Sequence, residues 1–445
     1  MKSRYLAAAG IAAVLAVAGC SSGKSSSGGS SASPTPAGSS SASASSSANT
    51  ASGTLTVWLQ TDAQTGWPKE VAAATQRFNA KYPNVKVDVQ YQTWADHLTK
   101  LDAALAATPP DVVELGNTET TKYMATGALA DITADKGKFD NSDTWLAALE
   151  QSVTYNGKLY GVPYYAGARA VIYRTDQWQG AGLSNPPTTL DEFLKDGEAL
   201  KAKYGANDPN YSALYWPGKN WYGAMSFVYG YGGAIATQDS SGKWTATLES
   251  PQSQAGLAEL KKIYDALSKA PADSDESKQD SIMAQGHVGM IYGNGWEVGV
   301  ITGPKDKGGN PDLKLAAFPM PGPDASKPLP SFLGGSDLVI PAASQHKDWA
   351  EEWINDFVGN TGMTALVNDA KVIPNTTSLL SLLGDNAFAK AASNSWFVPT
   401  AKNWADVESQ NILQTMLANI LGGKQSIADA TKAADAQINQ ILNGS

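Results

Sequence analysis

Apolar and polar residues alternate in two stretches near the start of the ordered part of the chain. Residues 53–60 (GTLTVWLQ) and residues 84–92 (NVKVDVQYQ) both carry apolar side chains at every second position. Alternation of this kind predicts two strands. Between them, apolar residues in the segment 68–82 recur at helical spacing. Pro68 suits the first turn of a helix, and Pro83 ends it.

The alternation of strands and helices continues beyond this point. Thr93 is placed to cap a second helix, and residues 109–116 (PPDVVELG) read as a short buried strand. A β-α-β-α-β series implies parallel strands with helices on both faces of the sheet. Ligands bind outside the carboxyl ends of such strands. We therefore expect the segments that follow residues 60, 92 and 116 to line a site.

Turn signals and helical periodicity predict further elements downstream. Asn156-Gly157 is a hairpin signal between two short apolar segments. Thr189 is expected to cap a helix over residues 190–203. The last third of the chain is expected to be mostly helical, over residues 346–357, 378–393, 407–421 and 427–442.

The N-terminal 20 residues, MKSRYLAAAGIAAVLAVAGC, have a basic head, an apolar stretch and small residues at the end. This order predicts a signal peptide over residues 1–19, with an apolar stretch too short to span a membrane. Cys20 is the only cysteine, and "VAGC" resembles the bacterial lipobox, in which this cysteine is lipidated. The alternative is a plain signal peptide with an incidental cysteine. Residues 20–53 are rich in Ser, Ala and Gly and should form a disordered tether.

Composition narrows the class of protein. The 445 residues carry a net charge of −9 without basic clusters, which argues against nucleic acid as a partner. The three histidines lie far apart and the body has no cysteine, so we expect no metal site, disulfide or cofactor. The acidic segment 272–280 lacks the glycine and glutamate of a calcium loop. Thirteen Trp and 17 Tyr indicate either a large core or an aromatic-lined site.

Five segments occur in an order that resembles a known family. They are RFNAKYPNVKVDV, PPDVVELG, YNGKLYGVPYYAGARAVIYRTDQWQGAGLSNPPTTLDEF, GHVGMIYGNGWEVG and FLGGSDLVIPAAS. The chain resembles the extracellular solute-binding proteins (family 1) of bacterial carbohydrate ABC transporters, and in particular the maltodextrin-type sugar-binding lipoproteins. The resemblance covers nearly all of the chain from about residue 54 to about residue 442.

The resemblance implies an α/β, two-lobed fold of the periplasmic-binding-protein type (type II). It has mixed sheets, helices on both faces and a hinge between the lobes. The chain would cross between lobes near Ala166–Ala170, Phe332–Ser336 and Asn375–Leu383. The implied N-terminal lobe comprises residues 54–166 plus 337–376, and the C-terminal lobe comprises residues 167–336 plus 377–445.

Sugars present hydroxyl groups and flat C–H faces, so their sites combine polar groups with aromatic rings. Trp221 and Tyr222 lie in PGKNWYG, which reads as a loop, and loops often carry binding residues. The alternative for both is core packing. Trp296 lies in GNGWEVG, and the resemblance makes it a stacking position.

The resemblance also implies stacking by Trp404 and polar contacts from Asp62 and Glu119. The alternative for these two carboxylates is solvation or helix capping. At position 167 this chain has glycine where the maltodextrin binders carry a carboxylate, which puts maltodextrin itself in doubt. The other candidate binding residues are Gln60, Trp94, Asn117, Tyr165, Arg169, Trp216, Gly335, Ser336 and Asp337.

Arg169 leaves two interpretations open. Its planar fork suits a ligand carboxylate or phosphate, but it could equally form a salt bridge at the hinge.

The leading hypothesis is a monomeric, non-catalytic receptor, lipid-anchored on the extracytoplasmic face of the cell membrane. It would close its lobes on a di- or oligosaccharide and deliver it to the permease of an ABC importer. One alternative is a binder of a phosphorylated polyol such as glycerol phosphate, with Arg169 and Lys219 on the anion. Another is a secreted glycoside hydrolase, for which no acid/base motif is recognised.

Overall fold

A computed structural model describes residues 50–94 and 96–444. The predicted signal peptide, the lipidation site Cys20 and the tether up to residue 49 lie outside the described residues. The first strand, β1, begins at Ser52 because Ser52 and Gly53 already pair with Asn84 and Val85 of the next strand. Ser52 and Gly53, which the sequence prediction assigned to the tether, therefore belong to β1.

A six-stranded mixed sheet forms the centre of the first lobe. β1 pairs with β2 and β3 in parallel, as the alternation of strands and helices predicted. β14 is antiparallel to both of its neighbours, β3 and β6. In spatial order the strands are β15 (Ile373–Pro374), β6 (Gly161–Gly167), β14 (Gly334–Val339), β3 (Val112–Gly116), β1 (Ser52–Gln60) and β2 (Asn84–Gln92).

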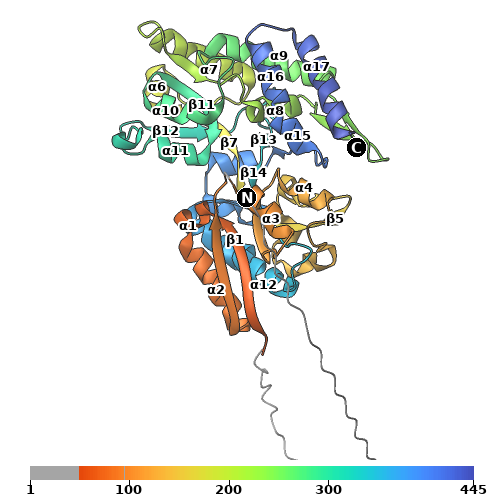
Figure 1. The fold of residues 1–445 in the computed structure, drawn as a ribbon. Helices are drawn as coiled ribbons and strands as arrows, with labels where there is room; N and C mark the ends of the chain where they lie inside the picture. Colours follow the sequence, from red (N-terminus) through yellow and green to blue (C-terminus); the bar gives the residue numbers. More distant parts are fainter. Residues whose placement is uncertain (1–49, 95, 445) are drawn as a thin grey trace, which may run out of the picture. The chain divides into compact units, whose positions relative to one another are not determined.

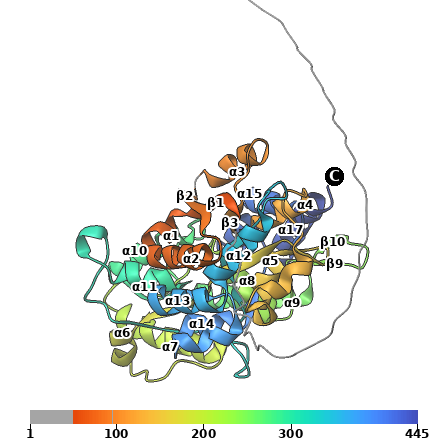
Figure 2. The same cartoon turned by 90° about the horizontal axis from the view of Figure 1, so that it is seen from below.

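Both faces of this sheet are covered, because its strands carry apolar residues on both sides. Val112 of β3 belongs to one buried cluster and Val113 to another. Helices α2, α12 and α13 cover the first face, and α3 and α4 cover the second. Although α2 and α12 are far apart in sequence, they lie side by side (Figures 1 and 2). The helices of this lobe are α1 (Thr61–Gly66), α2 (Pro68–Lys81), α3 (His97–Leu105), α4 (Thr120–Ala125), α5 (Ala147–Ser152), α12 (Lys347–Val358) and α13 (Asn360–Ala370).

A four-stranded sheet forms the centre of the second lobe. Helices α7, α8 and α9 pack on one face and α10 and α11 on the other. Its strands, in spatial order, are β12 (Leu315–Phe318), β7 (Arg169–Arg174), β11 (Val288–Asn294) and β8 (Ser212–Tyr215). The helices of this lobe are α6 (Thr175–Gly180), α7 (Leu190–Tyr204), α8 (Trp221–Gly230), α9 (Pro251–Leu267), α10 (Gln279–Ala284), α11 (Gly295–Ile301), α14 (Ala387–Ala392), α15 (Trp404–Ser409), α16 (Ile412–Leu421) and α17 (Ile427–Leu442).

Short elements complete the described chain. The dipeptide Asn156-Gly157 forms the predicted hairpin turn, with φ of 49° and 74° at its two residues. The remaining strand pairs are β4 (Thr154–Tyr155) with β5 (Lys158–Leu159), β9 (Ala236–Gln238) with β10 (Trp244–Ala246), and β13 (Ser331–Phe332) with β16 (Ser395–Trp396). The 3₁₀ helices are η1 (Thr133–Lys138), η2 (Ser142–Thr144), η3 (Glu276–Lys278), η4 (Lys305–Lys307) and η5 (Thr377–Leu383).

The chain passes from one sheet to the other within very short segments. Ala168 alone separates β6 of the first sheet from β7 of the second. On the return, Leu333 alone separates β13, which pairs with β16 outside the four-stranded sheet, from β14 of the first sheet. These two connections lie where the resemblance placed the first two crossings, and they bring the two sheets close together at one end.

Several boundaries differ from the sequence expectation. The N-cap of α3 is Asp96 and not Thr93, because the chain makes an additional turn after β2. The predicted helix over residues 378–393 is divided by Gly384, whose φ is 61°. Asn411, with a φ of 53°, likewise divides the residues expected to form one helix over 407–421. Helix α13 was not anticipated.

Within residues 50–94 and 96–444, no helix has both the length and the apolar character needed to cross a membrane.

A fully buried carboxyl group, Asp337 of β14, joins this strand to helices α4 and α5. Thr120 Oγ1 donates a hydrogen bond to it at 2.7 Å and Ser152 Oγ donates another at 2.9 Å. Burial raises the pKa of Asp337 to about 7. The folded state therefore holds this proton over a range of pH in which the unfolded chain has released it.

This buried acid should make stability depend on pH. Because its folded pKa lies above its ordinary value, its contribution is fully present below about pH 4 and is lost as the pH rises to about 7. Asp337→Asn keeps the shape but cannot ionise. Urea unfolding of the two proteins should show the wild type losing stability relative to D337N between these pH values. An exposed substitution, Asp306→Asn, serves as control. A difference that does not vary with pH would contradict the assignment.

Candidate functional site

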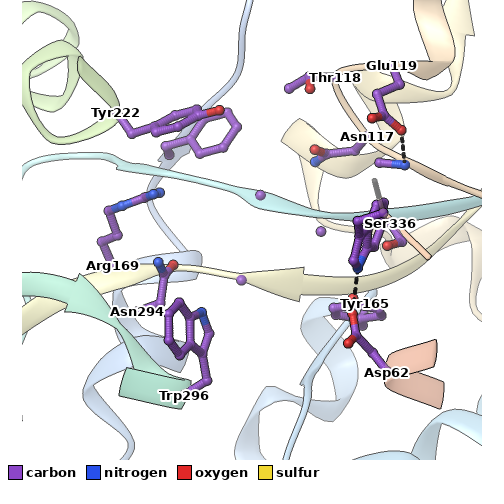
Figure 3. Close-up of a pocket in the computed structure, with 16 residues that line it drawn as sticks. Asp62, Asn117, Thr118, Glu119, Tyr165, Arg169, Tyr222, Asn294, Trp296 and Ser336 are labelled. Carbon is purple, nitrogen blue, oxygen red and sulfur yellow. Dashed lines mark hydrogen bonds between the residues drawn. The ribbon is translucent and has the colours of Figure 1, made fainter. Parts of the chain in front are cut away.

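The candidate site lies where the two sheets meet. The carboxyl ends of β1, β2, β3 and β6 gather at one edge of the first sheet, together with the first residues of β14. The end of β11 and the start of β7 face them from the second sheet, where Asn294 pairs with Arg169. A cavity of about 410 Å³ opens between these edges (Figure 3), a volume within the range of small-molecule sites.

Asp62 and Trp94 form one part of the first-lobe wall. Trp94 follows β2, and 40 % of its surface is exposed. Its indole N–H donates a hydrogen bond to Asp62 Oδ2 at 2.7 Å, shown as a dashed line in Figure 3. The Asp62 carboxylate thus fixes the orientation of the exposed Trp94 ring. A ring held in this way can stack against a flat face of a ligand.

Glu119 and His97 form a second part of this wall. Glu119 Oε2 accepts a hydrogen bond from Gly116 N and lies 2.9 Å from His97 Nε2. The other ring nitrogen of His97 lies 3.0 Å from the carbonyl oxygen of Trp94. Burial lowers the pKa of His97, but the hydrogen bond and charge of Glu119 raise it overall. Because both ring nitrogens face acceptors, the geometry fits an imidazolium that holds Glu119 in place.

The backbone of the hinge strands approaches very closely beside this wall. Gly335 has a φ of 144°, and a Cβ atom at this position would lie 2.0 Å from the carbonyl oxygen of Tyr165. No side chain fits there, which accounts for the glycine. The tight pairing places Ser336 and Tyr165 on the cavity lining. Glu114 lies beneath them, and its burial raises the pKa of its carboxyl group to about 7.

Arg169 and two aromatic rings form the second-lobe wall. The Arg169 guanidinium carbon lies 4.6 Å from the centre of the Tyr222 ring and 5.9 Å from that of Phe332. Asn294 and Trp296 complete this wall, and 65 % of the Trp296 surface is exposed. Figure 3 shows Arg169 between Tyr222 and Asn294, across the cavity from Asn117 and Glu119.

The cavity gathers most of the residues that the sequence proposed for binding. Those on the lining are Asp62, Trp94, Asn117, Glu119, Tyr165, Arg169, Tyr222, Trp296, Gly335 and Ser336.

Five other candidates are buried away from the lining. Gln60 lies beneath the sheet edge and donates from Nε2 to the carbonyl oxygen of Glu114. Asp337 is buried among the hydroxyl groups described above. The other three, Trp216, Trp221 and Trp404, are each at most 4 % exposed.

The three buried tryptophans belong to the core of the second lobe. Trp216 stacks on Tyr292 at a centroid distance of 5.6 Å with the ring planes 5° apart. Trp404 donates its indole N–H to Glu408 Oε1 at 2.7 Å. The expected loop around Trp221 ends at Asn220, which caps helix α8. Trp221 therefore points into the core.

The sequence did not single out Asn294 or Phe332. Asn294 ends β11, so the rule that ligands bind at the carboxyl ends of strands could have identified it. Phe332 gives no comparable signal, because an apolar residue before Leu333 reads as part of the core. Lys219, the second cation considered for an anionic ligand, is not among the lining residues. Among the described residues, no three His, Cys, Asp or Glu side chains are grouped so that they could hold a metal ion.

Comparison with known proteins identifies the class. A family model described as bacterial extracellular solute-binding protein matches residues 73–396, so the chain belongs to this family. This confirms the predicted class and a place of action outside the cytoplasm.

Individual relatives support this assignment. The chain is 36 % identical over 403 residues to the diacetylchitobiose binding protein DasA of Streptomyces coelicolor, covering 88 % of this chain and 90 % of that protein. It is 26 % identical over 323 residues to the lactose-binding protein of Rhizobium radiobacter, covering 69 % and 70 %. The solved structure of the sugar-binding protein MalE from Xanthomonas citri has a TM-score of 0.73 at 22 % identity, covering 88 % of this chain and 97 % of that one. This likeness confirms the two-lobed α/β fold.

The burial of Trp221 leads to a direct test. Its ring stacks on Tyr222 at a centroid distance of 4.0 Å and is 4 % exposed. Trp221→Ala should lower the free energy of unfolding by about 3–5 kcal/mol. Trp296→Ala removes an exposed ring and should change it by less than about 0.5 kcal/mol. Urea denaturation of both variants measures the contrast, and equal effects would contradict this placement of the two rings.

Proposed function

We propose that this protein is the substrate-binding subunit of a sugar ABC importer and holds a di- or oligosaccharide between its two lobes. The observation that carries the proposal is the cavity, in which exposed aromatic rings alternate with carboxylate, amide and guanidinium groups. Such a lining matches the two surfaces of a pyranose, its C–H faces and its hydroxyl groups. The relatives named for diacetylchitobiose and lactose binding support this ligand class.

The two walls of the cavity would recognise different parts of the sugar. The first lobe offers hydrogen-bond acceptors, because Asp62 and Glu119 are carboxylates that line the cavity. Sugar hydroxyl groups would donate to them. The second lobe contributes Tyr222 and Trp296, whose rings would lie against the sugar. Closure of the lobes would bring both sets of contacts onto one ligand.

Attachment and delivery complete the proposal. In the proposed division of the chain, residues 54–166 plus 337–376 form the N-terminal lobe, and residues 167–336 plus 377–445 form the C-terminal lobe. A lipid on Cys20 would hold this monomeric body at the extracytoplasmic face of the membrane, near the permease that accepts the sugar. More than one acyl chain is needed for stable anchoring, which multiple acylation of a lipobox cysteine would supply.

A phosphorylated polyol is less well supported as the ligand. A phosphate group would need several donors or cations, but Arg169 is the only lysine or arginine on the described lining. Asp62 lines the same cavity, and its carboxylate would repel an anion. Membership in a family of solute-binding proteins supports a binder over a hydrolase.

Binding should depend on the exposed rings of the cavity. Isothermal titration of the purified body with a panel of neutral oligosaccharides should give saturable binding without release of shorter sugars. Trp296→Ala should weaken binding about 10-fold or more while the protein remains folded. Trp349→Ala, which removes a partly buried ring that is not on the lining, is the matched control and should keep wild-type affinity. Equal affinities of W296A and the wild type would show that Trp296 does not contact the ligand.

Membrane retention tests the lipid anchor independently. Cys20→Ala removes the only cysteine of the chain, so the expressed protein should move from the membrane fraction to the medium. Quantitative immunoblotting of both fractions measures this. A Cys20→Ala protein that stays with the membrane would overturn the anchor without affecting the proposed ligand.

A further inference from the structure

Arg169 is a buried cation that the protein itself does not satisfy. The residue is 7 % exposed, and its buried Nε–H has no hydrogen-bond partner among the residues that the structure describes. Its nearest acid is Glu276, whose Oε1 lies 3.6 Å from Nη2. That distance is too long for a hydrogen bond. Burial raises the pKa of Glu276, while the charge of Arg169 opposes this rise.

A buried guanidinium with an unused donor calls for an explanation. A guanidinium carries five N–H donors in a rigid fork, and buried donors without partners are costly. The side chain is nevertheless held firmly against Tyr222 and Phe332 at the edge of the cavity. The fork is therefore free to donate to a ligand that enters the cavity.

The surroundings favour a neutral acceptor over an anion. Glu276 already offsets the charge of the guanidinium, and Asp62 and Glu119 line the same cavity from the other lobe. A carboxylate or phosphate bound to Arg169 would share the cavity with these carboxylates. A carbonyl oxygen accepts two N–H groups through its two lone pairs without adding charge.

The two aromatic rings add an apolar contact beside the fork. Tyr222 and Phe332 lie 4.6 Å apart, measured between ring centroids, and both line the cavity, although Phe332 is only 4 % exposed and offers little more than its edge. A small alkyl group attached to the bound carbonyl would pack against these rings. A carbonyl that carries a methyl group on one side and is joined to a sugar on the other is an acetamido group.

We propose that Arg169, together with Tyr222 and Phe332, forms a subsite for the acetamido group of an N-acetylated sugar. This inference rests on the proposed function. The guanidinium donates to the amide carbonyl, and the methyl group packs on the two rings. Arg169 is thus the residue that separates N-acetylated sugars from those with a hydroxyl group at the same carbon, because a hydroxyl group is too short to occupy both parts of the subsite.

The test uses two disaccharides that differ only in whether they carry acetamido groups. Isothermal titration compares N,N′-diacetylchitobiose with cellobiose, which has the same linkage and hydroxyl groups in place of the acetamido groups. The wild type should prefer the acetylated sugar by about 10- to 100-fold, as expected for one buried charge-assisted hydrogen bond. Arg169→Met should remove most of this preference by weakening the acetylated ligand, with cellobiose little changed. Arg169→Lys, which keeps the charge but loses the fork, should lie between the two.

The controls separate the possible failures. Lys219→Met removes a cation that is not on the lining and should keep the preference. A wild type that binds cellobiose as tightly as the acetylated sugar overturns the subsite but leaves sugar binding intact. Binding of none of the neutral sugars overturns the proposed function itself. A digalacturonate that binds more tightly than either would show that Arg169 selects an anion. The wild-type comparison needs no variant, so it remains decisive if R169M fails to fold.

Discussion

The pairing of β14 with β3 and β6 is the contact on which the rest of the structure depends. This strand is buried between two neighbours that precede it by more than 150 residues in the chain. Its first residues lie so close to Tyr165 that only glycine fits at position 335. That close approach fixes the spacing of β14 and β6 at the edge of the cavity, and with it the place of Ser336 and Tyr165. The binding cavity is a result of this strand register and not of any single loop.

The sequence predicted the local elements of the first sheet well. Residues 53–60 and 84–92 alternate in polarity, which predicts each strand, and the helix between them predicts that the two strands are parallel. The position of β14 between β6 and β3 could be reached only through the family resemblance, since a pairing across the chain leaves no periodic signal. The divisions at Gly384 and Asn411 were missed because each depends on a single backbone conformation with positive φ.

The candidate site was predicted through the ends of strands more reliably than through its aromatic residues. Asp62, Trp94, Asn117 and Glu119 all follow parallel strands, and all reach the cavity. The tryptophans of the second lobe gave a weaker guide, because one residue of helical rotation separates the buried Trp221 from the cavity-lining Tyr222. Spacing alone cannot decide such a case. An aromatic residue serves equally well as a core side chain and as a sugar platform, and tertiary packing determines which role it has.

The central position of β14 also bears on when the protein can fold. Until synthesis has passed Val339, the first sheet lacks its middle strand, and the edges of β3 and β6 have no partner. Pairings across so long a loop form slowly, and unpaired strand edges invite aggregation. The N-terminal half of the growing chain therefore cannot complete a lobe. For a protein that works outside the cytoplasm, this delay has an advantage, because the chain stays unfolded enough to pass through a membrane pore until about three-quarters of it has been made.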